Sequence, residues 1–274
     1  MNPLSLDQLT VIDLPPLDFV RTAAAAGYPF VSLFVHSPAP DFLPALDPAL
    51  AGPLRAALAE AGVEIGNLEC FDLSGDAPIR DFRGPIELGA SLGARLATAI
   101  NYRGTDPRRV AARFAEFAAL CAESGLRACI EPFSTGQTRS LGDAVSLLRL
   151  SGAPAAGLVL DALHVFRSGA SVEDVEALPE GLIAYAQLCD APARAALDRE
   201  GLEGEATAGR LDPGEGELPL ARLIAAIPDG VILGVEVPNA SRRAAGESAR
   251  DRAMAAGNAS RRLLASALRG DRHP

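Results

Sequence analysis

Seven glycine residues, spread along the chain, each stand between a helix-like stretch and a short apolar segment. They are Gly27, Gly62, Gly93, Gly125, Gly157, Gly181 and Gly230, and successive members lie 35, 31, 32, 32, 24 and 49 residues apart. Glycine tolerates the left-handed conformation that ends a helix, and an apolar run after it is typical of a strand buried on both faces. Since the spacing is close to one strand plus one helix, the pattern predicts a parallel sheet.

An eighth apolar segment, LSLDQLTV at residues 4–11, opens the chain, so we expect eight strands. The length of 274 residues agrees with the roughly 250 residues of an eight-fold β/α barrel. A doubly wound open sheet is the structural alternative, but its usual Gly-rich phosphate turn after the first strand is missing here. No linker or low-complexity tract divides the sequence. We therefore predict an α/β fold, a (β/α)8 TIM barrel, as a single domain over residues 1–274.

Four polar side chains in the second half of the chain fall at similar depths in their apolar segments. They are Glu131, Asp161, Gln187 and Glu236, which follow the nearest of these glycines by six, four, six and six residues. Because strand side chains alternate with a period of two, even offsets place all four on equivalent faces. Active sites of such barrels lie at the carboxyl ends of the strands. Three carboxylates and an amide oxygen form a hard donor set, which suits magnesium or manganese better than zinc or copper.

Composition excludes several classes of partner and chemistry. The net charge of -10 opposes binding to nucleic acid. All 25 basic residues are arginine, so Schiff-base lysine chemistry and a P-loop lysine are excluded. The segment before Arg21 has no basic residue, which is unlike a signal peptide, and no apolar run approaches the roughly 18 residues of a membrane span. The four cysteines are irregularly spaced, which is typical of free thiols in a cytoplasmic protein. Given also the charge and the lack of a long apolar run, we expect neither a membrane nor a nucleic-acid partner.

Five strings in residues 125–240 carry a resemblance to a known family. IEPF, LVLDALH, AQLCDAP, RLDPGEGELP and LGVEVP resemble, in order and spacing, the xylose-isomerase-like TIM barrel superfamily of sugar and sugar-phosphate isomerases and epimerases. The resemblance implies one divalent cation held on strands five to eight, by Glu131, Asp161, Gln187 and Glu236 in this chain. Glutamine at 187 and the PGEGE string are similar to the hydroxypyruvate-isomerase-like branch and to bacterial 3-dehydroshikimate dehydratases.

The chemistry follows from the cation. A cation bound to a carbonyl oxygen and the neighbouring hydroxyl polarises the carbonyl and stabilises an enediolate as the α-proton leaves. Glu131 and Glu236 are the predicted acid and base, and His164 is predicted to bind a substrate oxygen or relay a proton. We predict a metal-dependent isomerase or epimerase of a small sugar, sugar phosphate or hydroxy-keto acid.

Further side chains are predicted to contact the substrate, which we expect to be anionic. Arg210 is placed to bind a carboxylate or phosphate away from the metal, within an irregular insertion at residues 191–216. Asp190 and Arg194 lie beside the seventh strand as further contacts or orienting groups. Weaker candidates are His36, Glu69, Asn101 and Arg103, and the odd offset of Glu69 from Gly62 counts against it.

Two other functions stay open at this point. A metal-dependent lyase that resembles 3-dehydroshikimate dehydratase uses the same proton abstraction but expels a β-hydroxyl group. A non-catalytic barrel that binds a sugar is the second alternative, and a lack of bound metal would favour it. Because aromatic residues make up only 5% of the chain and tryptophan is absent, a small substrate is expected. The sequence does not determine the oligomeric state and is compatible with a homo-oligomer.

Overall fold

The computed structural model describes residues 2–38, 42–193 and 198–269 of the chain. Eight strands follow one another around a closed barrel, and every neighbouring pair is parallel, including β8 with β1. The strands are β1 (Leu4–Asp7), β2 (Phe30–Phe34), β3 (Glu64–Asp72), β4 (Leu96–Ile100), β5 (Arg127–Ile130), β6 (Gly157–Asp161), β7 (Ile183–Leu188) and β8 (Ile232–Val235). The predicted TIM barrel is confirmed.

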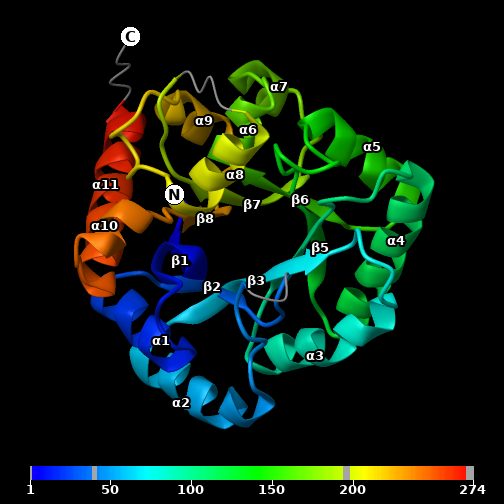
Figure 1. The fold of residues 1–274 in the computed structure, drawn as a ribbon, viewed down its shortest axis with the longest axis horizontal. Coiled ribbons are helices and arrows are strands. Elements are labelled where there is room, and N and C mark those ends of the chain that lie inside the picture. Colours follow the sequence, from blue (N-terminus) through cyan, green and yellow to red (C-terminus); the bar gives the residue numbers. More distant parts are fainter. Residues whose placement is uncertain (1, 39–41, 194–197, 270–274) are drawn as a thin grey trace.

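Helices surround the strands as an outer ring (Figure 1). They are α1 (Pro16–Ala25), α2 (Ala51–Ala61), α3 (Arg83–Ser91), α4 (Pro107–Glu123), α5 (Leu141–Ser151), α6 (Ala162–Arg167), α7 (Val172–Glu176), α8 (Arg199–Ala208), α9 (Leu220–Ala226), α10 (Ala240–Ala244) and α11 (Ala249–Arg269), with short 3-10 turns at Gln8–Val11, Pro48–Leu50 and Ile79–Phe82. Local signals set their starts. Asp106 accepts hydrogen bonds from the first backbone N–H groups of α4, and Ser140 with Asp143 forms a capping box on α5.

The glycine pattern is correct at six of its seven positions and wrong at one. Gly27, Gly62, Gly93, Gly125, Gly181 and Gly230 all have positive φ angles in the turns before strands. Gly157 instead forms the first residue of β6, and the left-handed residue that ends α5 is Gly152, with φ 62°. A side chain at 157 would lie 2.7 Å from Cβ of Ala184, so close approach of β7 explains this glycine.

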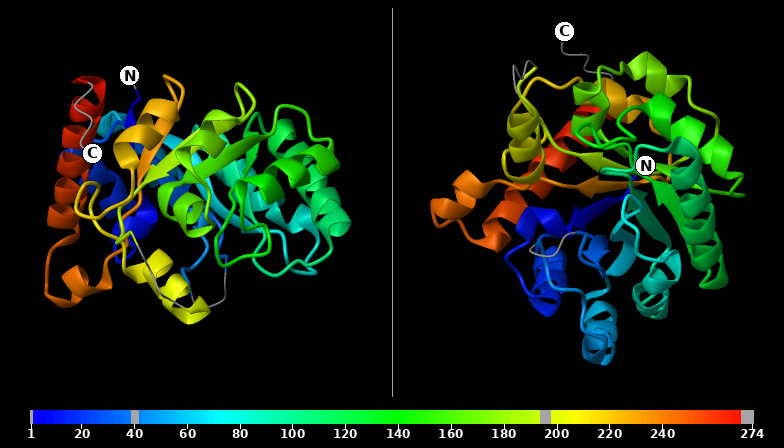
Figure 2. Two further views of the ribbon diagram at one scale, coloured as in Figure 1. Left: turned by 90° about the horizontal axis from the view of Figure 1, so that it is seen from above. Right: turned by 45° about the vertical axis from the view of Figure 1, so that its right-hand side comes forward.

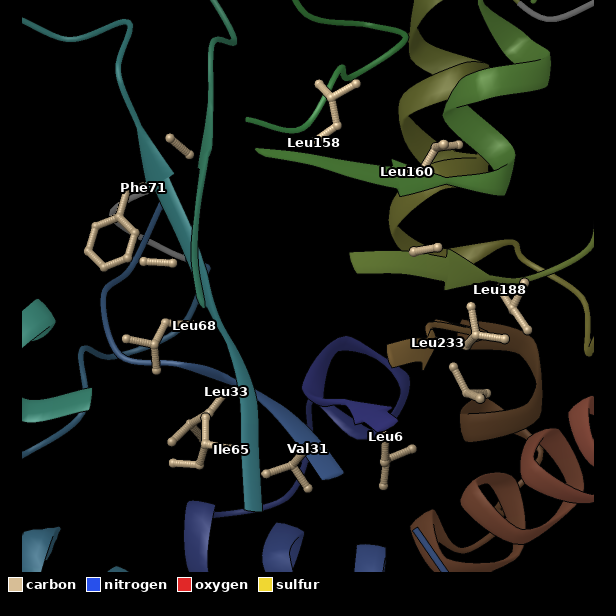
Figure 3. Packing of buried hydrophobic residues seen from close by; sticks show 14 of the residues in the cluster. Leu6, Val31, Leu33, Ile65, Leu68, Phe71, Leu158, Leu160, Leu188 and Leu233 are labelled. Carbon is tan, nitrogen blue, oxygen red and sulfur yellow. The ribbon is translucent and has the colours of Figure 1, made fainter. Parts of the chain in front are cut away.

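Strand side chains alternate between two environments, as the period of two requires. One set packs against the helices in the main core, where Figure 3 shows Leu6, Val31, Leu33, Ile65, Leu68, Phe71, Leu158, Leu160, Leu188 and Leu233. The other set includes a separate buried cluster of Leu96, Cys129, Val159, Tyr185 and Ile232. Further along the chain on the same face come the polar residues. Glu131, Asp161 and Gln187 each lie two residues after Cys129, Val159 and Tyr185, and Glu236 lies four residues after Ile232. Buried apolar residues therefore underlie the polar side chains at the carboxyl ends.

The segment predicted as an irregular insertion, residues 191–216, contains a helix, α8, and this corrects the expectation. Isolated antiparallel bridges, Asp190 with Leu211 and Gly209 with Asn239, fix the chain after it. The partly buried ion pair between Arg167 Nε and Glu205 Oε2, at 2.7 Å, joins α6 to α8. In Figure 2 (left), α8 lies at the same end of the barrel as α10, which follows β8. The insertion therefore covers the end where the strands terminate.

Within the described ranges, every helix falls short of the combination of length and apolar character that crossing a membrane requires.

Candidate metal centre

Four consecutive strands carry the predicted ligands to one end of the barrel. Glu131 directly follows β5, Asp161 ends β6, Gln187 lies in β7, and Glu236 directly follows β8. Asp161 pairs in register with Gln187, and the backbone N–H of Glu236 donates to the Leu188 carbonyl at 3.1 Å. All four side chains are buried. The structure thus brings together the set that even spacing predicted.

Two more carboxylates, Asp7 and Glu69, join this set. Ligand-capable atoms of Asp7, Glu69 and Glu236 lie within 4.8 Å of one another, and so do those of Glu131, Asp161 and His164. Sequence reasoning missed Asp7, although it ends the apolar string LSLD and is fully buried. The argument applied to Glu131, that a carboxylate in an apolar run must be neutralised, paired or metal-bound, would have found it.

Glu69 reaches the cluster because β3 is irregular. The register between β2 and β3 shifts between Val31 and Ser32, whose partners are Ile65 and Asn67, so Gly66 is an extra residue on β3. Such a bulge reverses which face the following side chains occupy. The odd offset of Glu69 from Gly62 is therefore the correct one for an inward-facing residue. Its carboxylate accepts from the Ser32 hydroxyl group, which also accepts from Asn67.

Arg210 lies inside the cluster, and this differs from the expected position away from the metal ligands. Its Nη1 contacts Asp161 Oδ2 and lies 3.0 Å from Glu236 Oε2, while Nε donates to the Ala206 carbonyl of α8 at 2.8 Å. The residue is only 1% exposed. The reason is electrostatic, because buried carboxylates need a compensating positive charge and α8 places this guanidinium among them. Arg210 thus neutralises two of the predicted ligands.

Burial and mutual repulsion set the protonation of these groups. Burial and the nearby Asp161 raise the pKa of Glu131 to about 8, and burial raises the pKa of Asp7 to about 7. Burial also holds the pKa of Glu236 well above its ordinary value, although Arg210 opposes the shift. Asp161 differs: burial alone would raise its pKa, but the Arg210 guanidinium together with His164 and its backbone N–H outweighs burial and lowers the pKa. The cluster therefore combines one carboxyl group whose pKa is lowered, that of Asp161, with others whose pKa values are raised.

His164 lies behind Glu131. It is buried, and burial lowers its pKa to about 4, so the ring is neutral. The Ser134 backbone N–H donates to Nδ1 at 3.4 Å, an arrangement that puts the ring proton on Nε2. Nε2 has no hydrogen-bond partner among the described residues and lies 3.9 Å from Glu131 Oε1. The ring is thus placed to orient Glu131 through its N–H group, and it lies outside the pocket lining, away from direct contact with a substrate.

A pocket of about 330 Å³ adjoins the cluster. Glu69, Glu131, Glu236 and Arg210 all line it, whereas His164 does not. Most of the remaining wall is apolar, with Leu9, Phe34, Phe42, Ile100, Tyr102 and Phe133. The pocket accepts a small molecule whose polar end meets the carboxylates and whose other parts meet aromatic rings.

The other predicted contacts have mixed outcomes. The carboxylate of Asp190 accepts from the backbone N–H groups of Ala191, Gly214 and Leu218, so it fixes the loop and is not part of the pocket lining, which corrects the expectation of a substrate contact. Arg194 lies outside the described residues.

The weaker candidates divide in the same way. Arg103 lines the pocket beside Tyr102, with its guanidinium carbon 5.6 Å from the ring centroid. His36 packs instead in an aromatic cluster, 5.0 Å from the Phe82 ring. Asn101 donates to the Gly104 carbonyl and the Thr138 hydroxyl, both at 3.0 Å, and shapes the turn after β4. Neither His36 nor Asn101 belongs to the pocket lining.

The position of Arg210 gives a prediction about stability. Arg210→Ala should lower the free energy of unfolding of the metal-free protein by about 3 to 5 kcal/mol, because it leaves Asp161 and Glu236 buried without their cation. Added manganese should recover part of this loss by supplying the missing charge. Chemical denaturation with and without manganese measures both effects. Arg222→Ala, which breaks the exposed pair with Glu173, is the control and should cost at most about 1 kcal/mol. Equal losses in the two variants would contradict the assignment.

Fold and site together define a metal-capable barrel of a known class. The family model of the xylose isomerase-like TIM barrel matches residues 20–259. The chain belongs to this family. Comparison with curated proteins gave no match.

Solved structures show the same fold at low sequence identity. The IolI protein, crystallised with a bound zinc atom, is 16% identical, with a TM-score of 0.79 over 96% of this chain and 98% of that one. The probable 3-DHS dehydratase AsbF from Bacillus anthracis is 17% identical, with a TM-score of 0.71 over 93% and 97% of the two chains. L-ribulose 3-epimerase is 14% identical, with a TM-score of 0.71 over 99% and 97%.

The residues present fit a divalent cation. The side-chain oxygen of Gln187, Oε1, is buried and has no hydrogen-bond partner among the described residues, a state that a cation would relieve. Glu131, Asp161 and Glu236 add carboxylate oxygens nearby. This donor set is rich in oxygen, and its three carboxyl groups outnumber the single guanidinium of Arg210 beside them.

Proposed function

We propose that the protein is a divalent-metal-dependent isomerase or epimerase that moves a proton at the carbon beside a carbonyl group. The observation that carries the proposal is that Glu131 and Glu236 both line the pocket and both have raised pKa values. A pair of carboxyl groups whose pKa values are both raised is suited to acid and base roles on one substrate. Glu131, Asp161, Gln187 and Glu236 would hold the metal, with magnesium or manganese favoured by their oxygen donors.

The chain's own residues divide the chemical work. Glu131 or Glu236 takes the proton from the substrate carbon, and the other returns it, which inverts a centre or transfers the proton to the neighbouring carbon. When bound, a divalent cation supplies positive charge that stabilises the negative charge developing on the substrate oxygens. His164 does not line the pocket, and its Nε2 lies 3.9 Å from Glu131 Oε1, where the neutral ring can orient that carboxyl group through its N–H. The apolar wall excludes water from the reacting end.

A metal-dependent lyase is the second candidate. The aromatic rings of the pocket wall, including Phe34, Phe42 and Phe133, favour a substrate with a ring, and AsbF, described as a probable 3-DHS dehydratase, has the same fold. Elimination also needs an acid for the leaving hydroxyl, and His164 does not line the pocket. We therefore rank the lyase second, and a non-catalytic sugar-binding barrel third. The anionic substrate, the cytoplasmic location and any homo-oligomer stay predictions from the sequence.

A screen in heavy water tests the proposal. With manganese present, the protein is incubated with ketohexoses, pentulose phosphates, keto and hydroxy acids and 3-dehydroshikimate, and products are followed by NMR and mass spectrometry. We expect an isomer or epimer that carries deuterium at the carbon beside the carbonyl. A dehydrated product would establish the lyase instead. Binding of a sugar without any turnover or exchange, by protein that lacks metal, would support the non-catalytic barrel.

A further inference from the structure

The amide of Gln187 has one end bound and one end free. Its Nε2 donates to Asp7 Oδ2 at 3.2 Å, whereas its Oε1 is buried without a hydrogen-bond partner among the described residues. Asp7 Oδ2 is the acceptor in this contact, and an acceptor selects the N–H side of an amide. The contact with Asp7 therefore determines which atom of Gln187 is left for another partner. A cation can bind only the oxygen.

Asp7 is itself held firmly in place. Its Oδ1 accepts from the Tyr185 hydroxyl at 2.6 Å and from the Ser5 hydroxyl at 3.1 Å. Gly234, the register partner of both Ser5 and Gln187, leaves room for the carboxylate, because a Cβ there would lie 2.2 Å from Asp7 Oδ2. Residues of β1, β7 and β8 thus fix the carboxylate that receives the amide. This carboxylate lies one strand beyond the four that carry the predicted ligands.

We propose that Asp7 is a positioning residue that turns the side-chain oxygen of Gln187 toward the divalent cation of the candidate metal centre. This inference rests on the proposed function, because it requires the cation. Histidine ligands of metals are commonly oriented by a hydrogen bond from their second nitrogen to a carboxylate, and the same physical requirement applies to an amide. An amide turned by 180° would present its NH2 group, which repels a cation. The glutamine therefore works as a ligand only while an acceptor holds its nitrogen.

A donor–acceptor swap tests this orientation. Asp7→Asn can donate to Gln187 and so permits the wrong orientation of the amide; we expect affinity for manganese to fall by about ten- to a hundred-fold. In Asp7→Asn/Gln187→Glu the total charge equals that of the wild type, the asparagine donates to the new carboxylate, and either oxygen of that carboxylate can bind metal. We expect the double variant to bind manganese at least as tightly as the wild type. Titration of chelator-treated protein, followed by electron paramagnetic resonance of free manganese, measures the affinities.

Glu69→Gln is the matched control, because it replaces one buried carboxyl group of the same cluster by an amide without touching the Gln187 amide. If Asp7 acted only through its charge, the two single variants would lose the same affinity, and that result would overturn the proposal. Failure of the double variant to recover binding would also overturn it. If thermal unfolding shows that Asp7→Asn does not fold, the manganese affinity of the double variant is the test: affinity at least equal to that of the wild type supports the proposal, and weaker binding overturns it. If wild-type protein binds no divalent cation, the candidate metal centre itself is wrong.

Discussion

Replacing Glu131 by glutamine is expected to lower turnover by about a hundred- to ten-thousand-fold, the range for loss of a general acid or base. Glutamine keeps an oxygen that can still bind a cation, but it cannot accept or return a proton. The raised pKa of Glu131, to about 8 through burial and the nearby Asp161, is the physical basis for this role. The effect should appear in kcat with the true substrate and in the rate of deuterium uptake, while the folded protein still binds manganese.

A second glutamate of the same pocket provides the control for this variant. Glu203 lines the pocket but is paired with Tyr102 and Arg199, outside the buried cluster. We expect Glu203→Gln to change kcat by less than about tenfold, because it touches the wall and not the reacting carbon. A normal rate in Glu131→Gln with metal bound would show that the acid and base have been assigned to the wrong residues.

Wild-type protein is expected to bind about one divalent cation per chain, and loss of two carboxylate ligands should abolish that binding. Glu236→Gln should weaken manganese binding by about a hundredfold or more, since it removes a charge from the donor set as well as a ligand. The double variant Asp161→Ala, Glu236→Ala should carry no measurable metal. Elemental analysis of the purified protein and calorimetric titration of chelator-treated protein give the two quantities.

The metal prediction has its own control and its own failure. Asp72→Asn changes a carboxylate that lines the pocket but only accepts from Ser74 and the Tyr102 backbone, so metal affinity should stay close to that of the wild type. Full metal occupancy in the double alanine variant would exclude this cluster as the metal centre. Arg210, which contacts Glu236, would then be the candidate positive group for stabilising charge on a substrate oxygen.

The family and the fold were predictable because they rest on periodic and local signals. Six glycines with positive φ angles mark the turns before strands, and the period of two in side-chain direction along β5 to β8 places the ligand candidates on the inner face. One part of this reasoning gave the right answer for the wrong reason. Gly157 is the first residue of β6 and does not end α5. The even offset of Asp161 from Gly157 therefore means only that both residues lie on the same face of that strand.

Glu69, Asp7 and Arg210 show what local reasoning cannot reach. The bulge at Gly66 changes the face on which Glu69 lies, and a bulge is visible only in the pairing of β2 with β3. Asp7 joins the site because the barrel closes β1 against β8, which are separated by more than 200 residues in sequence. Arg210 enters the cluster because α8, within a segment predicted as irregular, packs against the carboxyl end of the barrel through the Arg167–Glu205 pair.

The amino-acid sequence alone thus determined the barrel, its family and the four side chains at the ends of β5 to β8. Tertiary structure alone decided how their charge is balanced, which carboxylates accompany them and which face of the Gln187 amide is free. The physical reason is one of range. Turn conformation and strand alternation depend on neighbours within a few residues, whereas electrostatic compensation among buried groups depends on strands and helices that only barrel closure brings together.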